Sequence, residues 1–384
     1  MTQEGYIERS KDQASLSPYH GFEKQCTALD SELRSNSSGG LVESYISYLP
    51  ILYFGFTLQA CWEAVGLSLQ LNLLNGGPAS LVYGGLVTSV GSILIALSLA
   101  EMASADPVVG AQYRWSAAFA PFAPRFWGLF QGWITVFAWM TSTAASLAYL
   151  AQSLLAVIIL WYPDLEVAPW QNALVMCAFC VPPLVANLWL KRIIVPMEWI
   201  GAVGHGVFWI ASIAVLGALG TRSSHSAVWA NLTTGVSGWN QPGVTFGIGI
   251  LPLAFPTTSF DGVIHMSKEV RDAKRNVPAA MVFSVVMNCV MMFIWLVVTA
   301  YYLGDVGALA QAPLGVALIG VYMSATGSKE ATTLLIMCHT FIIYVSLANI
   351  FASSARLTWA FSENEGLPFS RYISHVSELL AQLA

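Results

Sequence analysis

Eight long apolar segments decide what this chain can fold into. Each holds at least the roughly 20 residues that an α-helix needs to cross a bilayer, and short polar stretches separate them. Only 10% of the residues are charged, against about 25% in a soluble domain. The sequence therefore predicts an all-α polytopic membrane protein, whose environment is the lipid bilayer and which has no nucleic-acid partner. The predicted spans cover residues 48–72, 79–101, 126–160, 170–190, 193–219, 243–265, 279–303 and 331–355.

Hydrophilic stretches at the two ends divide the chain into three regions. Residues 1–43 are polar and serine-rich, which predicts a disordered tail. Residues 44–355 form the predicted transmembrane domain. Residues 356–384 are typical of a cytoplasmic amphipathic segment, broken at Gly366 and Pro368.

The distribution of Lys and Arg predicts the orientation. If the N-terminus is cytoplasmic, 14 of the 16 basic residues lie on the cytoplasmic side, and only Arg222 and Lys329 lie outside. This orientation places the sequon at Asn231 outside, so Asn231 is a candidate glycosylation site. The sequon at Asn36 falls in the cytoplasmic tail, where we expect no glycosylation.

The sixth span is interrupted by prolines and polar residues. It begins as an apolar helix but meets Pro252 and Pro256 before a run of polar residues. An unpaired backbone group in hydrocarbon costs several kcal/mol, so such a break survives only where it lines a cavity or packs inside protein. Transporters build substrate sites from interrupted helices; a proline-kinked structural helix is the alternative. The polar run contains Thr257, Thr258, Ser259 and Asp261.

The first span also carries polar residues at membrane depth. Gln59, Trp62 and Glu63 lie between Gly55 and Gly66. A carboxylate within a span costs about 2.5 kcal/mol or more, so it normally faces a cavity or a partner. We therefore expect Glu63 to have a functional role, with a snorkelling side chain near one end of the helix as the alternative.

Other polar residues suggest a gate and a proton site. Glu101, at the cytoplasmic edge of the second span, precedes a Pro- and Gly-broken loop that contains Arg114, and the two are inner-gate candidates. Glu198 and His205 in the fifth span are proton-coupling candidates, because histidine titrates near neutral pH; a neutral packing histidine is the alternative. Candidate hydrogen bonders between helices are Asn288, His339 and Asn349.

The cysteines and histidines predict no metal site and no cofactor. Cys177 and Cys180 form a C-x-x-C pair in the middle of an apolar helix, with no second pair or histidine nearby. The six histidines are scattered, and no nucleophile stands beside a base in sequence. We therefore do not expect an enzyme.

Several stretches of this chain resemble fungal amino acid/choline permeases, which are GABA-permease-like members of the amino acid–polyamine–organocation superfamily. The stretches FTLQACWEAVGL and NGGPASLVYG in the first two spans agree with them. The resemblance covers about residues 45–378 in the same order. The stretches that carry it are SLAEMAS…GAQYRW (98–115), FDGVIHMSKEVRDAKRNVPAAM (260–281) and ARLTWAFSENEGLPFS (355–370).

The resemblance implies a leucine-transporter-like fold. Such a fold has two inverted repeats of five helices, with the first and sixth helices unwound at the bilayer midplane. By position, Phe260 is expected to be the aromatic residue that closes over the substrate. The expected substrate-binding residues are Gln59, Ala60, Cys61, Trp62, Glu63, Thr257, Thr258, Ser259, Phe260 and Asp261.

This chain departs from the family in two ways. Lys268 and Glu269 stand where family members commonly have two acids after the sixth helix, so we treat both as inner-gate candidates. Family members have about twelve spans, whereas eight are predicted here. The resemblance therefore implies a second repeat that contains only its first three helices and is apparently truncated.

The resemblance implies a secondary active transporter that imports amino acids, GABA, choline or a related small amine by proton symport with alternating access. A truncated, non-transporting relative with a regulatory or nutrient-sensing role is the alternative. Glu63 and Asp261, with Trp62 and Phe260, suit an amine or quaternary ammonium group, and a zwitterion could use the same acids together with helix N-termini. The expected location is the plasma membrane ahead of the vacuolar or another internal membrane.

Overall fold

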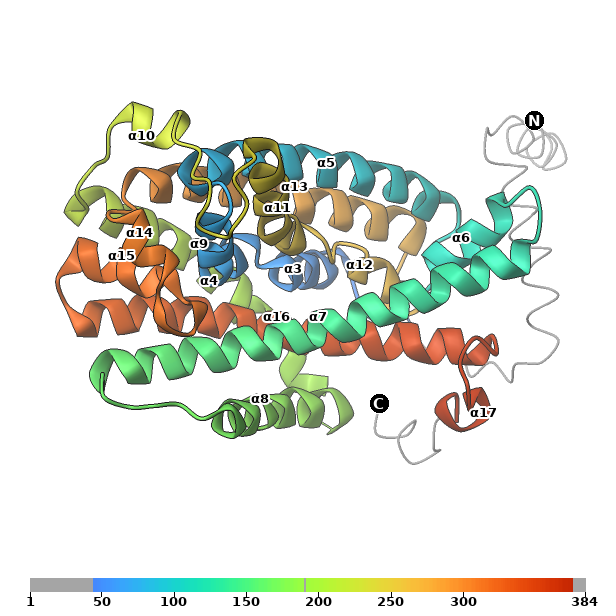
Figure 1. The fold of residues 1–384 in the computed structure, drawn as a ribbon. Helices are drawn as coiled ribbons and strands as arrows, with labels where there is room; N and C mark the ends of the chain where they lie inside the picture. Colours follow the sequence, from blue (N-terminus) through green and yellow to red (C-terminus); the bar gives the residue numbers. More distant parts are fainter. Residues whose placement is uncertain (1–43, 190, 376–384) are drawn as a thin grey trace, which may run out of the picture.

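The computed structural model describes residues 44–189 and 191–375, and this part of the chain is almost entirely helical (Figure 1). The predicted all-α architecture is confirmed. β-structure in these residues is limited to two isolated bridges, Ile46 with Val270 and Gly76 with Thr233. The α-helices are α3 (Tyr48–Gln59), α4 (Cys61–Leu74), α5 (Gly77–Ala105), α6 (Ala111–Phe119), α7 (Pro124–Trp161), α8 (Pro169–Trp189), α9 (Lys191–Leu219), α10 (His225–Trp229), α11 (Pro242–Ala254), α12 (Gly262–His265), α13 (Ala273–Tyr301), α14 (Val306–Ala310), α15 (Ala317–Thr326), α16 (Lys329–Glu363) and α17 (Ser370–Ile373), with 3₁₀ turns η1 (Phe255–Thr257), η2 (Ser267–Glu269) and η3 (Pro313–Gly315).

Within the described ranges, seven helical segments are long and apolar enough to cross a membrane. The chain is therefore an integral, multi-pass membrane protein. The predicted first span, 48–72, is absent from these seven because it is divided into α3 and α4. Ala60, between them, has a left-handed backbone with φ of 40°, which no continuous α-helix tolerates.

Helices α3 and α4 lie at the centre of the bundle. Helix α13 packs along α5 and α16 packs along α7, and α3 contacts both α13 and α16 (Figure 1). Most residues of α4 are buried, as expected for a helix that has no continuous polar face. The break at Ala60 therefore lies inside protein, where irregular backbone is tolerated at membrane depth.

The two ends of the bundle carry short helices. Helices α10, α14 and α15 lie at one end, and α6 and α17 lie at the other (Figure 1). Helix α16 continues to Glu363, so the predicted domain boundary at residue 355 falls inside a helix. The predicted segment 356–384 comprises the end of α16, the short α17 and residues after 375 that lie outside the described ranges, as does the predicted tail 1–43.

Candidate functional site

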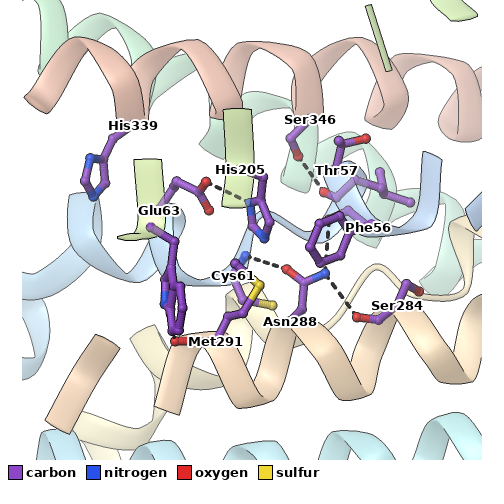
Figure 2. A network of polar contacts seen from close by, with 12 residues as sticks. Phe56, Thr57, Cys61, Glu63, His205, Ser284, Asn288, Met291, His339 and Ser346 are labelled. Carbon is purple, nitrogen blue, oxygen red and sulfur yellow. Dashed lines mark hydrogen bonds and ion pairs between the residues drawn. The ribbon is translucent and has the colours of Figure 1, made fainter. Parts of the chain in front are cut away.

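At the first helix break, side chains from two other helices form hydrogen bonds with backbone groups that the helix leaves unpaired. Asn288 on α13 donates to the Phe56 carbonyl at 3.0 Å and accepts from the Cys61 N–H at 3.2 Å (Figure 2). Ser346 on α16 donates to the Leu58 carbonyl at 2.5 Å. These bonds replace part of the helical ladder lost at Ala60, and they confirm Asn288 as a hydrogen bonder between helices.

The second break separates α11 from α12. Pro256 stands in the 3₁₀ turn η1, and Ser259 has a positive φ of 69°. Ser92 on α5 donates to the Thr257 hydroxyl at 2.8 Å. Thr258 is exposed, Ser259 and Asp261 are half-buried, and Phe260 is buried.

The two breaks lie side by side. The Cys61 thiol donates to the Pro256 carbonyl at 2.9 Å, and the Gln59 amide reaches the Thr258 carbonyl at 3.5 Å. Residues 59–63 are at most 4% exposed. Gln59 and Cys61 of the first break thus contact backbone carbonyls of the second break.

The Asp261 carboxylate accepts hydrogen bonds from side chains of α6 and α7. Its Oδ2 accepts from the Gln112 amide at 2.6 Å and from the Trp139 indole at 3.2 Å, and it lies 3.4 Å from His265 Nε2. The other nitrogen of His265 is 2.6 Å from the Val109 carbonyl. Since a carbonyl oxygen only accepts, that nitrogen carries a hydrogen. The contribution of Gln112 and Trp139 was not predicted, since neither stands near residue 261 in sequence.

Two buried acids near the first break pair with side chains of other helices. Glu63 Oε1 lies 2.8 Å from His205 Nδ1, and both side chains are fully buried (Figure 2). Glu198 accepts hydrogen bonds from Thr57 and from Asn349, the latter at 3.1 Å. The structure therefore pairs Glu63 with His205 and bonds Glu198 to Thr57, which lies one turn before the first break.

His339 is also buried, next to Trp62. Its Nε2 lies 3.4 Å from the Tyr322 hydroxyl on α15, and the Trp62 ring packs edge-to-face on it with centroids 4.6 Å apart. Asn349 and His339 thus both bond across helices, as predicted.

The inner-gate candidates contact different partners. Glu269 binds Arg356 of α16 through two hydrogen bonds of 2.5 and 3.0 Å and accepts from the Tyr45 hydroxyl at 2.9 Å. Partial burial and the neighbouring Glu269 charge raise the pKa of Tyr45 to about 12, so the phenol keeps the proton that it donates. The backbone N–H groups of Tyr45 and Ile46 both donate to the Glu269 carbonyl.

The other three inner-gate candidates lie elsewhere at this end. Lys268 sits 4.4 Å above the Trp359 ring and 3.8 Å from Glu363. Arg114 pairs with Asp106 at 3.0 Å. Glu101 is exposed on α5.

A separate surface cavity of about 370 Å³ lies between α7, α16 and α17. None of the expected substrate residues lines it, so it is distinct from the helix breaks. Its lining residues are Met140, Thr143, Phe351, Ser354, Ala355, Thr358, Trp359 and Ile373.

The predicted glycosylation site lies at the opposite end from the inner-gate candidates. Asn231 is exposed between α10 and α11, and its carbonyl accepts from the Ala79 N–H at 3.2 Å. The Thr233 N–H donates to the Gly76 carbonyl at 3.0 Å, which fastens the sequon to the start of α5.

Comparison with known proteins identifies the family. Residues 51–382 match the family model described as amino acid permease. A predicted amino acid/polyamine transporter of Macrophomina phaseolina is 28% identical over 85% of this chain and 72% of its own length. The choline transporter of Saccharomyces cerevisiae is 26% identical over 92% of this chain, and the GABA-specific permease of the same yeast is 24% identical over 86%. This chain spans 62% and 59% of those two yeast proteins. The relatives are transporters rather than enzymes, and the chain belongs to the amino acid permease family, as a fungal-type permease of the amino acid–polyamine–organocation superfamily.

Proposed function

We propose that this chain is the carrier of a small amine or amino acid, which it imports by alternating access. The observation that carries the proposal is the contact between the two helix breaks, made by Cys61 with Pro256 and by Gln59 with Thr258. Backbone groups freed from a helical ladder can bind a polar solute at membrane depth, where most of the bundle is apolar. The relatives' names support a substrate among amino acids, GABA, choline and polyamines.

The contacts of Glu269 support its role as an inner gate. Glu269 joins the segment before α3 to the end of α16 through Tyr45 and Arg356. These bonds tie together elements that must separate if the substrate is to leave between them. In this proposal the structure is closed toward the cytoplasm, and release requires the Glu269–Arg356 pair to open.

Proton symport is the proposed coupling, and the Glu63–His205 pair is its best-supported carrier. The pair stands directly after the first break, with no exposure, so water can reach it only when the bundle opens at this break. Glu198 is a second candidate, because it bonds to Thr57 just before the same break.

The proposed orientation has a cytoplasmic N-terminus, with the plasma membrane as the proposed location. The basic residues support this orientation, because 14 of 16 then lie on the inner side.

The test is uptake by transport-deficient yeast that expresses the tagged chain. Labelled GABA, neutral and basic amino acids, polyamines and choline are each supplied at acid and neutral pH. Saturable uptake that is stronger at acid pH supports a proton-coupled carrier. A chain that reaches the membrane but moves none of these solutes contradicts the proposal and favours the non-transporting alternative.

A variant at the second break tests the placement of the site. Ser259→Trp should abolish uptake without preventing membrane insertion, because the indole fills the space beside the break. Ser237→Trp, in an exposed loop, is the matched control and should transport normally. Normal transport by Ser259→Trp would place the substrate elsewhere.

A further inference from the structure

His265 is a completely buried histidine to which the proposed transport cycle gives no role. It is the last residue of α12, and its ring packs edge-to-face on the Trp139 indole of α7, with centroids 5.5 Å apart. Histidine can gain or lose a proton near neutral pH. The hydrogen bonds of its two ring nitrogens therefore decide which protonation state fits this position.

The Val109 carbonyl fixes the first ring proton. Nδ1 of His265 lies 2.6 Å from this oxygen, and a carbonyl oxygen can only accept a hydrogen bond, so Nδ1 carries a hydrogen. In a neutral imidazole the other nitrogen, Nε2, is then a bare acceptor. Nε2 is buried, and no hydrogen-bond partner reaches it among the described residues.

Asp261 presents a second acceptor to the same nitrogen. Its Oδ2 lies 3.4 Å from Nε2 and already accepts hydrogen bonds from Gln112 at 2.6 Å and from Trp139 at 3.2 Å. Two donors on one oxygen favour the ionised carboxylate. With a neutral ring, the lone pair of Nε2 would face a negatively charged oxygen inside the protein. A second ring proton, on Nε2, turns this repulsion into an ion pair.

No other charged group supplies the donor that Nε2 lacks. Within residues 44–189 and 191–375, His265 forms hydrogen bonds or ion pairs only with Val109 and Asp261. Helix α3, which packs against α12, carries only tyrosines as titratable groups. The charged groups near α12 on the other neighbouring elements are either exposed or paired. They are the exposed Arg125, Lys274 and Arg275 and the pairs Glu269–Arg356, Lys268–Glu363 and Arg114–Asp106.

We propose that His265 and Asp261 form a proton-binding site, which holds one proton on Nε2 and thereby fastens α12 to α6 and α7. The proton can enter through Asp261, whose side chain is 17% exposed and whose Oδ1 accepts no hydrogen bond within the described ranges. Without the proton, the two side chains repel each other. They then cannot both keep their bonds to Val109, Gln112 and Trp139, and α12 loosens from α6 and α7.

The protonation state of His265 can be observed directly by solid-state NMR. The full chain, labelled with ¹⁵N-histidine, is placed in lipid vesicles at pH 8, where a solvent-exposed histidine with a pKa of about 6.5 is almost entirely neutral. The wild type should show an imidazolium ring with both nitrogens protonated, and His265→Gln should lack that signal. His375→Gln, at an exposed position, is the matched control and should keep it. A neutral His265 ring in the wild type would overturn the proposal.

Asp261→Asn tests the partner without removing the histidine. The asparagine amide can donate to Nε2, so the ring of His265 should become neutral at pH 8 while its bond to Val109 remains. Elution of the variant as monodisperse detergent-solubilised protein shows that it is folded. An imidazolium signal that persists in folded Asp261→Asn would assign the proton to another partner and contradict the proposed site.

The pH dependence of stability gives a second readout. Above pH 7 the folded chain holds a proton that the unfolded chain releases, so this site contributes stability that is lost as the pH rises. Between pH 7 and pH 9 the melting temperature should fall more steeply for the wild type than for His265→Gln, and His375→Gln should follow the wild type. Parallel curves for the wild type and His265→Gln would overturn the proposal. Neither measurement uses transport, so such a result would leave the carrier function standing.

Discussion

His205 Nδ1 lies 2.8 Å from Glu63 Oε1, and neither side chain is exposed. The pair joins α9 to α4 directly beside the first helix break. The remaining polar atoms, His205 Nε2 and Glu63 Oε2, are buried without a hydrogen-bond partner among the described residues. Phe56 and Trp62 pack against the histidine ring. The contact between the two side chains therefore offsets most of the free-energy cost of burying them.

Removing the histidine should destabilise the protein strongly. His205→Ala leaves the Glu63 carboxyl buried without a partner, and breaking a buried pair in this way costs about 3–5 kcal/mol. The apparent melting temperature of the detergent-solubilised protein should fall well below that of the wild type. His375→Ala, at an exposed position, provides the control. Equal melting temperatures for the two variants would contradict the structural role of the pair.

Replacing the acid should alter the pH dependence of uptake. Glu63→Gln keeps a group that can hydrogen-bond to His205 but removes one titratable site. If the pair carries the coupled proton, stimulation of uptake by acid pH should be lost, whereas uptake at neutral pH should fall less. Uptake measured between pH 5 and pH 7.5 checks this. Full acid stimulation in Glu63→Gln would move the coupling site to another group, with Glu198→Gln as the next variant.

Opening the inner gate should expose the first break to the cytoplasm. Cys61 is completely buried beside that break, so it can report access once the other cysteines are replaced by serine. In inside-out vesicles, Arg356→Ala should increase the rate at which a membrane-impermeant maleimide labels Cys61, because Glu269 loses its bidentate partner. Arg371→Ala, on the exposed α17, is the control. Equal labelling rates in the two variants would show that the pair does not hold the inner side closed.

The sequence indicates local features of this site better than its long-range pairs. Pro252, Pro256 and the polar run after them predict an interrupted helix, because proline removes a backbone donor at its own position. The break at Ala60 is harder to locate, since neither proline nor glycine stands there. Only Gln59, Trp62 and Glu63 in an apolar span indicate its neighbourhood.

The pairs that connect the site come from residues far apart in sequence. Glu63 and His205 are 142 residues apart, and Gln112 and Asp261 are 149 residues apart. Their partners depend on how α4, α6 and α9 pack against one another, which the hydrophobic periodicity of each helix does not determine. For the same reason the sequence identified Glu269 as a gate candidate but did not identify Arg356 as its partner.

Close packing at the second break predicts an effect of a single methyl group. A Cβ at Gly262 would lie 2.5 Å from Leu58 Cδ2 and 2.7 Å from the Trp139 ring. Gly262→Ala should therefore cost about 1–3 kcal/mol of stability, as overpacking usually does, and should reduce uptake by displacing Trp139. Gly91→Ala on α5, where nothing lies within 4 Å, is the matched control. A melting temperature for Gly262→Ala equal to that of Gly91→Ala would refute the tight contact.

Glycosylation can test the orientation on which the gate and the direction of transport depend. Asn231 is exposed and follows α10, which lies at the end of the bundle opposite α6 and α17 (Figure 1), whereas Asn36 precedes α3 in the sequence. With a cytoplasmic N-terminus, the wild-type chain should carry a glycan that endoglycosidase H removes. Asn231→Gln should abolish the resulting mobility shift, and Asn36→Gln should keep it. Because α3 and α4 form one broken span, the two sequons lie on opposite sides of the membrane in either orientation. Loss of the shift in Asn36→Gln alone would therefore reverse the assignment, place the Glu269–Arg356 pair at the outer surface, and make it an outer gate.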